Sequence, residues 1–463
     1  MDRPPSPTLQ NLTSLQQLLW LFVPIILALN VMFIPLHAGD DYDHFERAYT
    51  VAHLTLWPTS IEGGKLSSGG YVDKGISNVI ERETFAIYTF PRAKYTYMPA
   101  LEKRATPWTG QLEFRPFPGS SSYLPLIYLP QAIAIRGGEA WDMTVEDTIF
   151  LARILNGGLA LALIAVAITL LPTSAASLVV LTLAMPKTLL LFASNSIDPL
   201  LHASTLMVLA FCCRALLSDW RPRILDFLWV GLLMLAIIGV RPPMAALGLL
   251  PLFVAARTRA ISGGAIVGVA IGLGVAWWIA VLPMMRDLRC NWNGDLPDKM
   301  EIFLGNGVGL ILNSFFSHGA YYFMTFVGEL GYGQAPQSLF FKLPDWIYIF
   351  ASVVLLLAVV RAISGNVEFK LSDRVAFAGL AILIVVGIFF SMSAVCTAAG
   401  SKDIAGVQGR YFMAPLWLST LAICGIGRDL KIIERIFQPL ATIFVLSSFT
   451  LLLLEGQRIY WMR

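Results

Sequence analysis

Acidic side chains are concentrated in the run Asp-Asp-Tyr-Asp-His-Phe-Glu-Arg, which occupies residues 40–47 of this 463-residue chain. The run directly follows an apolar segment, residues 18–36, that is long enough to cross a bilayer. Carboxylates and imidazoles move protons when they lie within hydrogen-bond reach of a reacting group. Charge at a membrane surface is costly unless it is paired or used, so we interpret Asp40, Asp41 and His44 as the chemical centre. The alternative is that the acids cap a short interfacial helix and pair with the arginine that ends the run.

Further charged residues stand where apolar runs begin, end or are interrupted. Asp198 is followed by a proline, a pattern that fits either a helix N-cap or an acid that helps to build a site. Arg241, in Val-Arg-Pro-Pro, and Arg410, beside Tyr411, can bind a phosphate bidentately or can reach ordinary lipid head groups. Lys187 lies inside an apolar run after a proline, where a lysine is usually paired or functional.

The composition is that of a polytopic membrane protein. Hydrophobic residues make up 56% of the chain and charged residues only 14%, against about 25% charged residues in globular domains. The apolar runs lack the alternation of a transmembrane β-barrel, and the net charge of +3 is too small to indicate a nucleic acid partner. We predict one all-α membrane domain, residues 1–463, with about eleven transmembrane helices. They are expected at residues 17–36, 148–171, 175–194, 199–217, 224–240, 244–256, 263–284, 345–362, 374–393, 411–427 and 437–454.

Arginine and lysine residues are concentrated in short loops that indicate the orientation. These loops lie near residues 214–223, 257–259, 361–374 and 428–435. With eleven spans all of them fall on one side, which the positive-inside rule assigns to the cytoplasm together with the N-terminus. Two large segments, residues 37–147 and 285–344, then face outward and carry interfacial helices. Residues 123–135 are apolar but contain two prolines, and we expect an interfacial or re-entrant helix there rather than a full span.

Cys290 and Cys396 both fall on the external side in this topology. That compartment is oxidising in many bacteria, so a disulfide between them is a hypothesis. The remaining cysteines, Cys212, Cys213 and Cys424, fall in or near spans and are expected to be reduced.

Four short motifs, in their order and their places in this topology, resemble the GT-C superfamily of membrane glycosyltransferases. They are Asp-Asp-Tyr-Asp-His-Phe-Glu-Arg-Ala at residues 40–48, Tyr-Leu-Pro-Leu-Ile-Tyr-Leu-Pro at 123–130, Ser-Asn-Ser-Ile-Asp at 194–198 and Gly-Val-Gln-Gly-Arg-Tyr-Phe at 406–412. The outline is similar to protein O-mannosyltransferases and the lipid A aminoarabinose transferase, and the local motifs resemble a bacterial family of GT-C-like membrane proteins. In relatives the second acid of the first motif is often Glu, whereas it is Asp41 here. The choice between Asp40 and Asp41 as the base therefore stays open.

The resemblance implies an enzyme of the bacterial inner membrane that transfers a sugar from a polyprenyl-phosphate donor to a glycan or lipid acceptor. Transfer would occur on the periplasmic face and would invert the anomeric carbon. Asp40 or Asp41 would deprotonate the acceptor, and His44 would shape the site. The expected substrate-binding residues are Asp198, Arg241, Arg410, Tyr411, Gln408 and Lys187. In some relatives the acid at the external turn acts through a divalent metal ion, whose ligands here would be Asp40, Asp41 and Asp198; no other cofactor is indicated.

Two other functions stay open from the sequence. One is a transporter or flippase of a lipid-linked glycan, and the other is a non-catalytic subunit of polysaccharide assembly. Transport favours charged groups near the bilayer midplane and repeated halves. Here the charged groups are expected at the external surface, and the halves of the chain differ.

Overall fold

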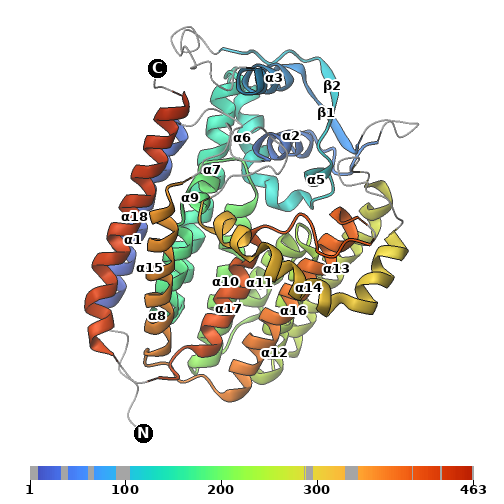
Figure 1. Ribbon diagram of the computed structural model, residues 1–463. Helices are drawn as coiled ribbons and strands as arrows, with labels where there is room; N and C mark the ends of the chain where they lie inside the picture. The colour runs from blue at the N-terminus through green and yellow to red at the C-terminus, as the bar shows by residue number, and fades with distance from the viewer. Residues whose placement is uncertain are drawn as a thin grey trace.

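Helices account for most of the described chain in the computed structural model, as the sequence predicts (Figure 1). The structure describes residues 9–32, 40–60, 67–89, 105–285, 287, 296–328, 343–398, 400–427 and 430–460. The described α-helices are α1 (Leu9–Met32), α2 (Asp41–Ala52), α3 (Lys74–Thr89), α5 (Pro118–Ser121), α6 (Leu129–Ala140), α7 (Val145–Leu170), α8 (Thr173–Leu183), α9 (Pro186–Phe192), α10 (Asp198–Leu217), α11 (Ile224–Ile238), α12 (Leu249–Thr258), α13 (Ile261–Val281), α14 (Leu296–Val327), α15 (Asp345–Ile363), α16 (Leu371–Cys396), α17 (Met413–Ile423) and α18 (Lys431–Tyr460). The described 3-10 turns and strands are η1 (Pro125–Tyr128), η2 (Pro242–Gly248), η3 (Leu282–Met284), η5 (Gly409–Phe412), β1 (Gly69–Asp73) and β2 (Leu112–Pro116).

Among the described helices, 7 are long and apolar enough to cross a membrane. They are α7, α10, α13 with η3, α14, α15, α16 and α18. The number becomes 8 if α8 and α9 form one bent span, so the predicted count of about eleven is not confirmed. Other predicted spans are shorter helices: α11 has 15 residues and α17 has 11, whereas crossing the hydrocarbon core takes about 20.

The span predicted at residues 175–194 is broken in the middle by Pro186. Met185 has φ −60° and ψ 137°, the extended conformation that a residue before proline prefers. Helix α8 therefore ends at Leu183, and α9 begins at Pro186 with a bend of 78° between the two helices. Helix α9 packs against α7 and α10, and the loop after it leads into the candidate site.

The first predicted external segment contains a small sheet, which corrects the all-α prediction. Strands β1 and β2 pair antiparallel, with Gly69 opposite Pro116 and Asp73 opposite Leu112. The carboxylate of Asp73 accepts backbone N–H groups from the residues that follow β1 and precede β2, which fixes this end of the sheet. Helix α2 packs against β1 and α6, and Figure 1 shows α2, α3 and the strands together at one end of the helix bundle. The sheet therefore supports the acidic run.

Two helical segments outside the predicted spans frame the site. Residues 123–135 form η1 and the first part of α6, which has only 12 residues and is too short to cross a membrane. Helix α14, within the predicted second external segment, has 32 residues and kinks at Asn306, whose φ of −143° is not helical. Because α14 is long and apolar enough to be a span, its location in an external loop stays a prediction. Helix α14 packs against α16 and η5.

Two of the basic loops used to predict orientation contact each other, and one of them also contacts the end of α17, which precedes a third. Arg257, near the end of α12, forms an ion pair with Asp373 in the first turn of α16. Arg374 donates hydrogen bonds to the carbonyl oxygens of Ala422 and Cys424 at the end of α17. The contacts place these loops together, as a common side of the membrane requires. Which side is cytoplasmic stays a prediction.

Cys396, at the end of α16, is disulfide-bonded. Cys290, its predicted partner, lies outside the described residues. Cys212, Cys213 and Cys424 are buried free thiols, as the sequence predicts.

Candidate functional site

The two neighbouring aspartates have different surroundings because the backbone turns between them. Asp40 has φ 54° and ψ 5°, in the left-handed region that Asp adopts more readily than most residues. Asp41 begins α2, a helix whose residues are mostly buried. The turn therefore gives the two carboxylates separate partners, although they are adjacent in the sequence.

Asp41 forms a fully buried structural ion pair. Its Oδ2 lies 2.7 Å from a guanidinium nitrogen of Arg153 in α7. Its Oδ1 accepts the backbone N–H of Asn195 at 2.6 Å. These contacts join α2 to α7 and to the loop before α10. Because Asp41 does not line the cavity described below, it has no access to a ligand there, and Arg153 has the structural role that its place in the sequence favours.

Arg410 joins the other two predicted acids. Its Nη2 lies 3.3 Å from Oδ2 of Asp40, and its Nη1 lies 2.9 Å from Oδ2 of Asp198. Arg241 contacts the second oxygen of Asp198 at 3.2 Å, and its guanidinium lies 4.2 Å from the centre of the Tyr411 ring. Burial lowers the pKa of Arg410, but the facing carboxylates outweigh burial and raise the pKa well above its ordinary value, so the group stays cationic. The structure thus brings together five predicted site residues.

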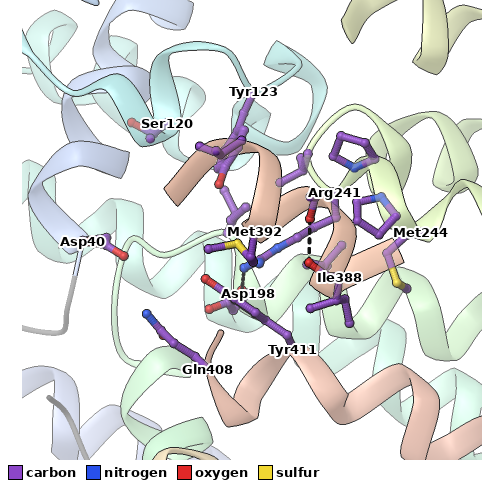
Figure 2. A pocket seen from close by; sticks show the side chains of 18 of the residues that line it. Asp40, Ser120, Tyr123, Asp198, Arg241, Met244, Ile388, Met392, Gln408 and Tyr411 are labelled. Atoms are coloured by element: carbon purple, nitrogen blue, oxygen red, sulfur yellow. Dashed lines mark hydrogen bonds and ion pairs between the residues drawn. The ribbon is translucent and has the colours of Figure 1, made fainter. Parts of the chain in front are cut away.

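These residues line one end of a cavity of about 470 Å³. Asp40, with 33% of its side chain exposed, and Gln408 contribute to that polar end. The apolar lining comes mainly from η2 and α16: Pro242, Pro243, Met244, Ile388, Met392 and Val395. In Figure 2, Asp40 and Gln408 lie on one side of the view, and Met244 and Ile388 lie on the other. A cavity with a charged end and an apolar remainder suits a ligand with an anionic head and an apolar tail.

His44 lines the same cavity from α2. Its Nδ1 lies 2.8 Å from the hydroxyl of Tyr128, and its ring stacks against Tyr123 at 6.2 Å. Burial lowers the pKa of His44 from 6.5 to about 4, so the imidazole is neutral at neutral pH. The neutral ring adds a hydrogen-bonding group, rather than a cation, to the polar end.

The remaining predicted residues lie around the cavity or apart from it. Tyr411 and Gln408 line it, whereas Lys187 is buried in α9 and is not among the lining residues. Lys187 nevertheless lies close enough to Arg410, Asp40 and Asp198 to interact with their charges. The alternative interpretation was that the acids of the run pair with Arg47. The structure shows other partners for this arginine. Arg47 donates to the carbonyl oxygens of Leu56 and other loop residues and fixes the loop after α2.

The predicted metal ligands do not form a metal site. The described residues contain no group of three or more His, Cys, Asp or Glu side chains that could hold a metal ion. Asp41 is committed to Arg153, and Asp198 is shared between two arginines. Carboxylates neutralised by guanidinium groups are poor ligands for a hard cation, so we derive no step through a metal ion.

Four buried polar atoms at the cavity wall have no hydrogen-bond partner among the residues that the structure describes. They are Nε of Arg241, Nε of Arg410, Nε2 of His202 and Oγ of Ser122. The sequence analysis did not identify His202 or Ser122. For His202 a signal existed, because residues four apart lie on the same face of a helix and His202 follows Asp198 by four positions. Buried polar atoms are normally hydrogen-bonded, and a ligand in the cavity can supply partners for these four.

The fold and the site together define a polytopic helical membrane protein with a charged cavity between its helices. The chain matches the family model described as "Predicted membrane protein (DUF2142)" over residues 22–419, and it belongs to that family. No curated protein and no solved structure matches the chain.

Proposed function

We propose that this protein transfers a sugar from a polyprenyl-phosphate donor to a hydroxyl group of a glycan or lipid acceptor. The observation that carries the proposal is the position of Arg410. It connects Asp40, a partly exposed carboxylate, to the buried pair of Asp198 and Arg241 at the polar end of an otherwise largely apolar cavity. The resemblance to GT-C glycosyltransferases supports the same chemistry.

The cavity suits the donor in two respects. Arg241 and Arg410 each have a buried Nε without a partner among the described residues, and guanidinium groups bind phosphate oxygens in a planar, bidentate geometry. The apolar lining from η2 and α16 can accept the first part of a polyprenyl chain. The lipid tail would then lie among the later helices, as the sequence analysis expects.

The proposed reaction is a direct displacement. The acceptor oxygen attacks the anomeric carbon and forms the new glycosidic bond, while the bond from that carbon to the phosphate oxygen breaks. The hydroxyl proton passes to Asp40, and the electron pair of the broken bond leaves with the phosphate. Arg410 and Arg241 stabilise the added negative charge on the phosphate. Attack from the face opposite the leaving group inverts the anomeric carbon.

Asp40 is the better candidate for the base because the carboxylate of Asp41 is already paired with Arg153. A general base must reach the hydroxyl that it deprotonates, and Asp40 lines the cavity whereas Asp41 does not. Asp40 shares Arg410 with Asp198. A donor phosphate that recruits this guanidinium would therefore weaken the contact to Asp40 and make its carboxylate more basic.

The clustering of charge at one end of the cavity favours transfer over transport. A transporter for a lipid-linked glycan would need a polar path through the membrane, whereas the lining beyond the arginines is mainly apolar. We place the reaction on the periplasmic face of a bacterial inner membrane, following the distribution of basic loops.

The test is transfer by purified protein in proteoliposomes, with a panel of synthetic polyprenyl-phosphate sugars and a mixed glycan and lipid acceptor pool. Asp40→Asn should lower the transfer rate by about 10²–10⁴-fold, the usual contribution of a general base. Asp219→Asn, on an exposed loop, is the matched control and should retain the wild-type rate. Full transfer by Asp40→Asn would overturn the assignment. Movement of the donor across the membrane without product would instead favour a flippase.

A further inference from the structure

His202 lines the cavity but has no part in the proposed chemistry. Only 6% of the residue is exposed, and its Nε2 is buried with no hydrogen-bond partner among the described residues. The residue lines the cavity together with Leu201 and Thr205 of the same helix. A buried polar group without a partner is destabilising, so the site is incomplete without something that contacts Nε2.

The position of the ring is fixed by its neighbours. His202 lies one turn beyond Asp198 in α10, so it sits below the charged end of the cavity and on the same helix face. Its ring packs edge-on against Trp417, with 5.8 Å between the ring centres. The indole N–H of Trp417 is itself anchored by the hydroxyl of Thr182. The imidazole therefore occupies a defined place one helical turn beyond Asp198.

We infer that Nε2 of His202 hydrogen-bonds a hydroxyl group of the donor's sugar, an assignment that rests on the proposed function. A hydroxyl both donates and accepts, so it complements either tautomer of a neutral imidazole, whereas a phosphate oxygen complements only the tautomer with a proton on Nε2. The phosphate already has two guanidinium groups, and a polyprenyl chain offers no hydrogen bond at all. Among the parts of the donor, the sugar carries hydroxyl groups that have no other assigned partner in this site, so we assign one of them to Nε2.

The neighbouring threonine does not compete for this role. The hydroxyl of Thr205 already donates to the carbonyl oxygen of Leu201 at 2.8 Å. Among Leu201, His202 and Thr205, the side chain that needs a hydrogen-bond partner from a ligand is therefore His202. This gives the cavity a means of distinguishing a sugar-bearing lipid phosphate from the spent carrier, which keeps the phosphate and the chain but lacks the hydroxyl.

The experiment compares two ligands on full-length protein in nanodiscs, with affinity measured by native mass spectrometry. One is a polyprenyl phosphate without sugar, and the other is the same lipid phosphate bearing the hexose that the wild type binds most tightly in a panel. His202→Phe keeps the ring that packs on Trp417 but removes the nitrogen. We expect it to weaken binding of the sugar-bearing lipid about tenfold, as for one lost hydrogen bond, and to leave binding of the sugar-free lipid unchanged. Thr205→Val is the matched control and should change neither affinity.

The outcomes separate this inference from the proposed function. Equal weakening of both ligands by His202→Phe, or no weakening of either, overturns the assignment of His202. So does a wild type that binds no sugar-bearing lipid more tightly than the sugar-free form. If the wild type binds neither ligand, the proposed function itself fails. Folding of the His202→Phe variant is checked separately by its near-ultraviolet circular dichroism. If that variant is misfolded, His202→Gln, which retains a hydrogen-bonding side chain, must keep both affinities or the assignment fails.

Discussion

Replacing Asp41 by Asn should damage the fold, whereas replacing Asp40 by Asn should damage only the chemistry. The Asp41–Arg153 pair is 2.7 Å long, and its side chains are 0% and 2% exposed. Removing one partner of such a pair leaves a buried charge without compensation, which costs about 3–5 kcal/mol. The Asp40–Arg410 contact is longer, at 3.3 Å, and a third of the Asp40 side chain is exposed. Its loss should cost no more than about 1 kcal/mol.

Thermal unfolding in detergent, read from the near-ultraviolet circular dichroism, measures the stability difference, and donor turnover measures the chemistry. The expected result is a clear fall in the unfolding temperature for Asp41→Asn and almost none for Asp40→Asn. The double variant Asp41→Asn/Arg153→Gln is the matched control. It removes the uncompensated cation and should recover part of the lost stability.

The reasoning is refuted if Asp41→Asn is as stable as the wild type. It is also refuted if the double variant is no more stable than Asp41→Asn alone, because the cost would then not come from the stranded charge of Arg153. Equal loss of turnover in two equally stable single variants would return Asp41 to the list of candidate bases.

Three further predictions follow from the site and its scaffold. Burial lowers the pKa of His44 to about 4, so the unfolded chain binds a proton first as the pH falls below 6.5, and the contribution of His44 to stability should drop by at most about 3 kcal/mol between pH 6.5 and 4. Burial raises the pKa of Glu46 to about 7, which changes stability in the opposite direction, so the measurement is the stability of the wild type minus that of His44→Gln across this range, and this difference should fall. A methyl group at Gly409 would clash with the backbone at Tyr322 in α14. Gly409→Ala should therefore displace the adjacent arginine and reduce lipid phosphate binding at least tenfold in the native mass spectrometry assay, whereas wild-type binding would show that α14 does not position this loop. Ser60 is exposed in the segment that we predict to be external. A cysteine placed there should react with a membrane-impermeant maleimide in whole cells, whereas a cysteine at Asp219 should react only after permeabilisation. The reverse pattern would invert the predicted topology.

The sequence predicted the helices better than it predicted the spans, and several of its candidate site residues lie together in the structure. Apolar runs identify helices reliably, but a run does not reveal whether its helix is straight or long enough to cross a bilayer. The break at Met185 follows from the proline after it and could have been predicted from local sterics. The two five-residue strands could not have been predicted in this way. Strand β1 begins with a glycine pair and β2 ends with a proline, and both features weaken the local strand signal.

Arg410 and Asp198, both candidate site residues from the sequence, form an ion pair although 212 positions separate them. Their charge was the signal, since a charged residue beside an apolar run needs a partner or a function. Lys187 carried the same signal but lies away from the cavity lining. Charge therefore predicted which residues needed partners, but the partners themselves depend on how α9, α10 and η5 pack.

The difference between Asp40 and Asp41 shows where local sequence stops being informative. Both residues have the same side chain, and they stand next to each other at the start of the same helix. A single left-handed residue, Asp40, turns the chain so that one carboxylate meets Arg410 at the cavity and the other meets Arg153 in the interior. The backbone cost of that conformation is about 1–2 kcal/mol, and the buried pair of Asp41 can offset it only because α7 supplies Arg153 from 112 residues away. The chemical role of each acid is thus set by tertiary contacts, and the same fold that withdraws Asp41 from the cavity leaves Asp40 as the carboxylate of this pair that faces a ligand.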